Sequence, residues 1–208
     1  LKLPNKAELD AFKAELAANM ELPNAIIDHL RSYDLSTVHP MAALRTAISL
    51  LGLYDKEADV MESEANKRKA IRIAQIATIV TSFARIRQGK EPIKPKNDLS
   101  YAANFLFMLN GEEPKDIEVE AINKALVLHA DHELNASTFT ARVCVATLSD
   151  IYSGVTAAIG ALKGPLHGGA NERVMKMLTE IGEEENAIPY IKEKLENKEK
   201  IMGMGHRV

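Results

Sequence analysis

The sequence predicts an all-α fold. Apolar residues recur at spacings of three or four along most of the 208 residues, which is the period of an amphipathic helix. We find no run in which β-branched and polar residues alternate, as a half-buried strand would require. Prolines and glycines divide the chain into segments of helical length, and the short links between the first of these segments imply antiparallel neighbours.

The first three expected helices are bounded by proline and glycine. One begins at Pro4 and Asn5 and ends at Pro23, one lies over residues 26–33, and one extends from Pro40 to Gly52. Apolar residues lie on one side of each helix, so we expect each to bury a stripe. The stripe residues are Leu9, Phe12, Leu16, Met20, Ile26, Ile27, Leu30, Tyr33, Met41, Leu44, Ile48 and Leu51.

Longer segments follow. A single helix is expected over residues 62–87, and the loop GKEPIKPKND ends it. A short helix covers residues 101–109, and Pro114 begins another. The expected apolar side of that helix holds Ile117, Ile122, Leu126 and Val127. The basic residues of the long helix are expected on a solvated face, and they are Lys67, Arg68, Lys69 and Arg72.

The C-terminal third is rich in small residues. Residues 141–162 are expected to form a helical run whose Ala, Gly, Ser and Thr allow close packing, in a core or at a subunit interface. Asn171 is then expected to cap a last helix, which Gly182 closes. Its apolar residues are Val174, Met175, Leu178 and Ile181.

Composition excludes several classes of protein. The 26 Lys and Arg against 29 Asp and Glu give a net charge of −3, which argues against a nucleic-acid partner. No run approaches the roughly 18 apolar residues of a membrane span, and the first residues lack a secretory signal. Cys144, the only cysteine, lies in an apolar run, so we expect a buried side chain, a reducing compartment and a cytoplasmic protein.

Four of the six histidines lie in unusual settings, whereas His29 and His39 are expected only to pack or cap. His129 and His132 of HADHELNAST are three apart and are expected on one helical face. Acidic neighbours make a metal site conceivable, but the HExxH pattern and an obvious third ligand are missing, so we predict none. The alternative is that a histidine, with Asn135 and Ser137, hydrogen-bonds a polar substrate.

The two other histidines are embedded in glycines. His167 lies in GPLHGGAN before an expected helix, where the positive end of the helix dipole favours a neutral imidazole that can donate a hydrogen bond to a developing enolate. The alternative is an ordinary glycine-rich turn between domains. His206 lies in GMGHRV, which is not a dinucleotide fingerprint because Val208 stands where that motif needs glycine.

Taken together and in order, HADHELNASTFTARV, GPLHGGANE and IMGMGHRV resemble the citrate synthase family, and its bacterial type most of all. The resemblance extends upstream through DLSTVHPMAALRTAISLLG and so covers essentially the whole chain. It implies a mostly helical homodimer that joins acetyl-CoA to oxaloacetate, giving citrate and CoA, without a tightly bound cofactor. It also implies a large domain over residues 1–166 and the start of a smaller one over residues 167–208.

The resemblance further implies a role for each motif. His167 hydrogen-bonds the thioester oxygen of acetyl-CoA during enolisation, and His206 polarises the ketone of oxaloacetate and supplies its proton. His132 binds oxaloacetate or citrate, and Ser137 orients His167. Backbone at Ile201, Met202, Gly203 and Gly205 contacts CoA.

The family's catalytic base and its carboxylate-binding arginines are expected beyond Val208. The chain also begins without methionine, so we expect both ends to be truncated and the 208 residues alone to be inactive. Three alternatives stay open. They are a 2-methylcitrate synthase that uses propionyl-CoA through the same residues, a non-catalytic helical binding or dimerisation module, and a histidine-based metal protein.

Overall fold

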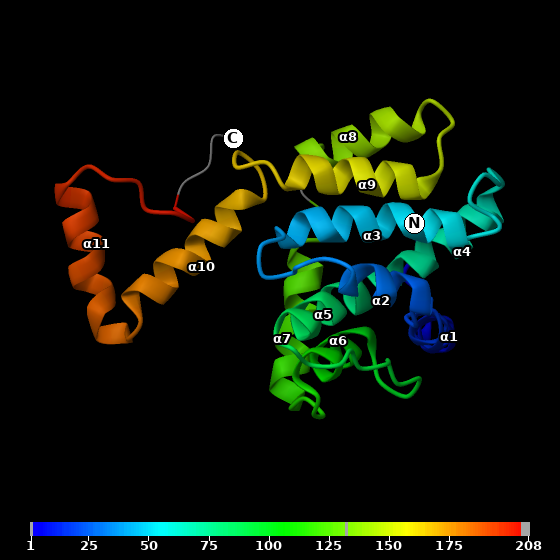
Figure 1. Cartoon of the computed structure of the whole chain (residues 1–208), viewed down its shortest axis with the longest axis horizontal. Coiled ribbons are helices and arrows are strands. Elements are labelled where there is room, and N and C mark those ends of the chain that lie inside the picture. Colours follow the sequence, from blue (N-terminus) through cyan, green and yellow to red (C-terminus); the bar gives the residue numbers. More distant parts are fainter. Residues whose placement is uncertain (1, 132, 205–208) are drawn as a thin grey trace. The chain divides into compact units, whose positions relative to one another are not determined.

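The computed structural model describes residues 2–131 and 133–204, and within these ranges helices are the regular structure and no strand occurs (Figure 1). The predicted all-α class is therefore confirmed. None of the described helices has both the length and the apolar character that a membrane span needs. The helices are α1 (Lys6–Ala18), α2 (Asn24–Arg31), α3 (Pro40–Tyr54), α4 (Ser63–Arg72), α5 (Ile76–Arg87), α6 (Tyr101–Asn110), α7 (Asp116–Leu128), α8 (Ala136–Val145), α9 (Ile151–Leu162), α10 (Gly169–Ile181) and α11 (Ala187–Glu196).

The chain divides into two compact units, Leu1–Gly160 and Ala161–Val208. The first contains α1 to α8 and most of α9, and the second contains α10 and α11. The boundary expected between residues 166 and 167 stays a prediction.

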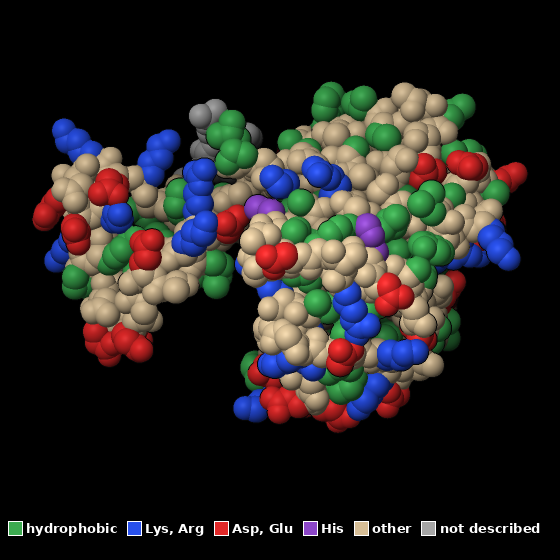
Figure 2. Space-filling model, viewed as in Figure 1, with side chains coloured by type: hydrophobic (Ala, Val, Ile, Leu, Met, Phe, Trp, Pro, Cys, Tyr) green, Lys and Arg blue, Asp and Glu red, His purple; other side chains and the backbone are tan. Residues whose placement is uncertain are grey.

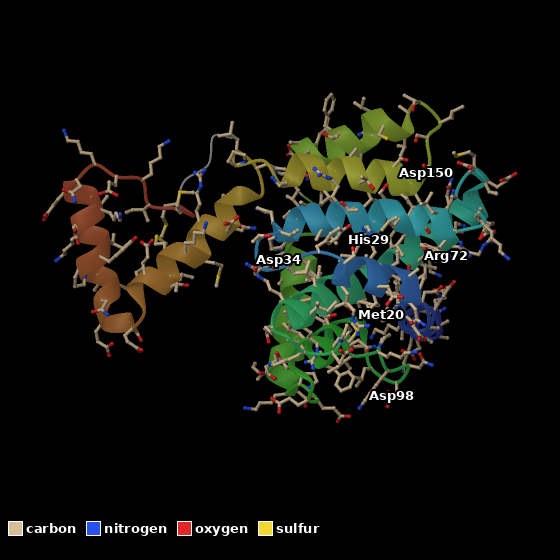
Figure 3. The ribbon with its side chains drawn as sticks, viewed as in Figure 1. Met20, His29, Asp34, Arg72, Asp98 and Asp150 are labelled. Carbon is tan, nitrogen blue, oxygen red and sulfur yellow. The ribbon has the colours of Figure 1, made fainter. Side chains whose placement is uncertain are left out.

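The core of the first unit forms around α3. Ile48 and Leu51 of α3 are buried against Ile79 of α5 and Ile159 of α9. A second cluster surrounds Met20, which is completely buried (Figure 3). Because α5 packs against α2, α3 and α6, it connects these two hydrophobic clusters.

Several predicted helix ends are confirmed. Asn5 caps α1 by accepting a hydrogen bond from the Glu8 N–H at 2.9 Å. Pro40 is the first residue of α3, and the Nδ1 atom of His39 accepts from the Met41 N–H at 3.1 Å, so His39 is a cap as predicted. Gly182, with φ of +71°, ends α10.

The expected helix over residues 62–87 is wrong, because a 3₁₀ turn at Ile73–Gln75 separates α4 from α5. Gln75 in that turn donates from its amide to the Glu21 carbonyl at 2.6 Å. The turn lets α4 contact α1 while α5 contacts α2, α3 and α6. The apolar pattern continues through the break, so the sequence contains no local signal of it.

The expected run over residues 141–162 is also wrong, since it comprises the end of α8, a turn and α9. Leu148 takes a left-handed conformation with φ of +65°. Asp150 then accepts from the Ser153 N–H at 2.9 Å, as a residue that begins a helix does. Cys144 is half-buried rather than buried.

Three further details differ from prediction. Gly168, not Asn171, is the N-cap of α10. The apolar sides of α1 and α7 are largely exposed, and α7 buries no residue in this chain. The exposed members of the expected stripes are Leu9, Phe12, Ile117, Leu126, Val127, Met175 and Leu178.

Candidate active site

His167 lies in the tight turn that leads into α10. Its backbone N–H donates to the Gly164 carbonyl at 3.0 Å, and the Gly168 N–H donates to the Leu162 carbonyl at 3.0 Å. A Cβ atom at position 168 would lie 2.5 Å from that Leu162 oxygen, so only glycine fits there. The turn therefore holds a partly exposed imidazole at the start of α10, where the backbone N–H groups of Gly169 and Ala170 donate to the carbonyls of Gly164 and His167.

Asn135 and Ser137 lie together at the start of α8. Asn135 is the N-cap, since its side-chain oxygen accepts from the Thr138 N–H at 2.9 Å. Ser137 donates its hydroxyl to the Ala158 carbonyl at 3.1 Å, which ties α8 to α9. Ser137 and His167 belong to different units, so the expected contact between them stays a prediction.

The other histidine motifs are described only in part. His129 is the C-cap of α7, and its Nδ1 donates to the Ala125 carbonyl at 2.7 Å. Because α7 ends at Leu128, the expectation that His129 and His132 share one helical face is wrong. His132, Gly205 and His206 lie outside the described residues. Among residues 2–131 and 133–204, no three His, Cys, Asp or Glu side chains are grouped as a metal site would need.

The segment expected to contact CoA follows α11. Gly203 has φ of +84°, and a Cβ atom there would lie 3.0 Å from Val174 of α10. Met202 lines a cavity of about 240 Å³ between α10, α11 and this segment. Four cations and Glu180 line the cavity, but Lys176 pairs with Glu172 at 2.7 Å and Lys194 pairs with Glu199 at 2.6 Å, which leaves Arg173 and Lys200 against Glu180.

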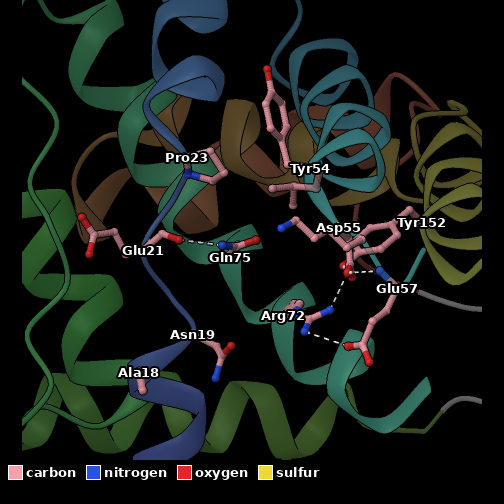
Figure 4. Close-up of a pocket in the computed structure, with 12 residues that line it drawn as sticks. Ala18, Asn19, Glu21, Pro23, Tyr54, Asp55, Glu57, Arg72, Gln75 and Tyr152 are labelled. Carbon is pink, nitrogen blue, oxygen red and sulfur yellow. Dashed lines mark hydrogen bonds and ion pairs between the residues drawn. The ribbon is translucent and has the colours of Figure 1, made fainter. Parts of the chain in front are cut away.

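A charged cluster that the sequence did not indicate lies at the end of α3 (Figure 4). Asp55 accepts from Arg72 at 2.5 Å and from the Tyr152 hydroxyl at 2.6 Å, and Arg72 also donates to Glu57 at 2.9 Å. Arg68 pairs with Glu57 as well. The cluster borders a cavity of about 540 Å³ and joins α3, α4 and α9.

The cluster perturbs two titratable groups. Burial alone would raise the pKa of the Asp55 carboxyl, but hydrogen bonds from Tyr152, the Glu57 backbone and Arg72 outweigh it and hold the pKa below its ordinary value. Burial, and then the hydrogen bond to Asp55, raise the pKa of the Tyr152 phenol. Asp55 is therefore a carboxylate that the fold keeps ionised.

The basic run of α4 is only in part the solvated face that we expected, because Lys67 and Arg68 are exposed whereas Lys69 is buried. Lys69 is completely buried and donates to the carbonyls of Ala58 and Val60 at 2.8 and 2.7 Å. Arg68 and Arg72 pair with the acidic residues of the loop after α3. These cations fix residues 55–60, and no local pattern distinguishes them from surface charges.

Comparison with known proteins places the whole chain in one family. A family model described as "Citrate synthase, C-terminal domain" matches residues 1–208. Citrate synthase 2 of Bacillus subtilis is 71% identical over 209 residues, which are 100% of this chain and 56% of that protein. A 2-methylcitrate synthase of Mycobacterium tuberculosis is 48% identical, over 100% of this chain and 52% of that protein.

The fold agrees with the sequence comparison. The solved structure of citrate synthase from Thermoplasma acidophilum, a ternary complex with carboxymethyl-CoA and oxaloacetate, superposes with a TM-score of 0.87 at 32% identity. The match covers 100% of this chain and 54% of that one. The chain thus spans about half the length of the relatives that it matches. It belongs to the citrate synthase family.

Proposed function

We propose that the protein containing this chain is a citrate synthase that condenses acetyl-CoA, oxaloacetate and water to citrate and CoA. The turn of His167 carries the proposal. This turn holds an imidazole, followed in the sequence by two glycines, at the start of α10. The chain is also 71% identical to citrate synthase 2 of Bacillus subtilis.

The chemistry explains why such a turn is needed. The methyl group of a thioester is a very weak carbon acid, so its enolate forms only where a preorganised donor stabilises the developing oxyanion. His167 donates that hydrogen bond from its ring. The base that takes the methyl proton is expected outside these 208 residues. The enolate carbon then attacks the oxaloacetate ketone, His206 protonates the resulting alkoxide, and water cleaves the thioester to release CoA.

Substrate contacts are assigned to the remaining motif residues. His132 and Asn135 bind oxaloacetate, and Ser137 orients His167. Backbone at residues 201–203 and at Gly205 contacts CoA. Arg173 and Lys200, at the cavity that Met202 lines, support this assignment, because CoA carries several phosphate charges.

We also infer a domain boundary near residue 166, with a large domain before it and the start of a smaller one after it. The observed division after Gly160 lies close to this boundary and supports it. A cytoplasmic location is inferred from composition alone.

The condensation assay tests the proposal. The full-length protein is expected to form citrate and free CoA thiol from acetyl-CoA and oxaloacetate. The 208 residues alone are expected to form none, because the base and the carboxylate-binding arginines are missing. Normal turnover by the isolated chain would contradict the assigned mechanism, and a full-length protein without turnover would favour a helical binding module.

A homodimer is the second part of the proposal, and the exposed apolar residues of α7 and α8 support it. Neither helix buries a residue within the chain, and Figure 2 shows hydrophobic side chains over the α8 region. An apolar surface of this kind is typical of a subunit interface. Its residues include Val127 at 73% exposed, Phe139 at 55% and Val143 at 53%.

Negative charges introduced into this surface by mutation are expected to separate the subunits. The double variant Val127→Glu, Phe139→Glu should halve the mass that light scattering measures for the full-length protein, because two buried carboxylates would be desolvated without partners. Leu3→Glu is the control, since Leu3 is 88% exposed in the segment before α1. An unchanged mass of the double variant would place the interface elsewhere.

A further inference from the structure

A groove beside α5 has the features of a small-molecule site that the condensation does not use. It has a volume of about 400 Å³ and lies between α2, α5 and the loop at residues 91–95. This volume is in the usual range for binding pockets, which is roughly 300 to 1,000 Å³. All of its lining residues belong to the first compact unit.

The base of the groove contains an unpaired hydroxyl. Ser82 of α5 is 1% exposed, and its Oγ atom has no hydrogen-bond partner among the described residues. Its neighbours are paired: Thr78 donates to the Met20 carbonyl at 2.6 Å, and Thr81 donates to the Ala77 carbonyl at 3.0 Å. A buried hydroxyl without a partner destabilises the folded state, so native structures rarely keep one that nothing satisfies.

The walls and the rim restrict the chemistry of a ligand. The walls include the apolar side chains of Leu22, Ile27 and Ile93. At the rim, Lys94 pairs with Glu21 at 2.5 Å and Arg31 pairs with Glu91, so these cations are already neutralised. Asp28 adds a further negative charge, which disfavours an anionic ligand.

We propose that this groove binds a small neutral molecule with an apolar body and one hydrogen-bonding group, which pairs with Ser82 Oγ. The proposal does not depend on the condensation reaction or on His167.

Two probes of nearly equal shape test the proposal in the full-length protein. Benzyl alcohol carries the hydroxyl that Ser82 would bind, and toluene lacks it. Both are titrated while the methyl resonances of Ile27 and Ile93 are followed by NMR. We expect benzyl alcohol to change the chemical shifts of these methyl groups in a concentration-dependent way that saturates. In Ser82→Ala, the ratio of the toluene Kd to the benzyl alcohol Kd should fall about fivefold, which corresponds to one neutral hydrogen bond.

Two further variants control the experiment. Thr156→Val removes another buried hydroxyl without a partner among the described residues, on α9 and outside the groove, and should leave the ratio unchanged. Ile93→Trp fills the groove and should abolish the shifts of Ile27 with both probes. The proposal is overturned if benzyl alcohol gives no saturable shift, as when water or another segment of the protein occupies the groove. An unchanged ratio in Ser82→Ala overturns it equally.

Discussion

Replacement of His167 by alanine in the full-length protein is expected to lower kcat for citrate formation by about 10² to 10⁴. The imidazole is the proposed donor to the enolate oxygen, and its hydrogen bond is strongest when charge has developed there. KM for oxaloacetate should change little, because that substrate is assigned to other side chains. The measurement is steady-state release of CoA thiol at saturating substrates.

Exchange of the acetyl-CoA methyl protons with solvent deuterium reports enolisation directly. We expect His167→Ala to slow this exchange as much as it slows kcat. His39→Asn is the matched histidine control, because the side chain of His39 caps α3 and asparagine is also a good cap. If His167→Ala retained wild-type exchange, the residue would have no part in enolisation.

Loss of the Asp55 carboxylate is expected to have the largest effect on stability. Asp55→Ala leaves the Arg72 guanidinium and the buried Tyr152 hydroxyl without their shared acceptor. We expect the free energy of unfolding to fall by about 3 kcal/mol, the low end for breaking a buried ion pair, because the Arg72 side chain is 31% exposed. Urea denaturation of the full-length protein measures this loss.

An exposed ion pair provides the control. Asp10→Ala breaks the pair between Lys6 and Asp10, whose side chains are 91% and 55% exposed, and should change stability by less than about 0.5 kcal/mol. Equal effects of Asp55→Ala and Asp10→Ala would show that the cluster at the end of α3 is no more than a surface network.

The pH dependence of the Asp55 effect has a defined sign. The pKa of this carboxyl is lower in the folded state than its ordinary value of 3.8, so its stabilising effect is complete above that pH and is lost as the pH falls through the folded-state pKa. The difference in stability between wild type and Asp55→Ala should therefore narrow below about pH 4. A difference that widened on acidification would contradict the assignment.

Local signals in the sequence predicted the helices well where their ends depend on local chemistry. The helix ends at Asn5, at His39 with Pro40 and at Gly182 depend on contacts with residues close by in the sequence. Such ends can therefore be predicted from the sequence alone. The glycines around His167 left a glycine-rich turn open as the alternative to a ligand site, and the structure has a tight turn there.

Features that depend on distant contacts were not predictable. The break between α4 and α5 is accompanied by a hydrogen bond from Gln75 to Glu21, which is 54 residues away. Tyr152 and Asp55 are 97 residues apart, and nothing near either residue indicates the other. The apolar stripe of α7 was expected to be buried, but no described part of this chain covers it.

Product identification with two competing acyl donors tests the central claim most directly. The full-length protein is given oxaloacetate with equal concentrations of acetyl-CoA and propionyl-CoA, and the acids formed are separated and identified by mass spectrometry. We predict that citrate predominates. Predominance of 2-methylcitrate would identify propionyl-CoA as the preferred substrate, and the absence of both acids would contradict the assignment of this protein as a condensing enzyme.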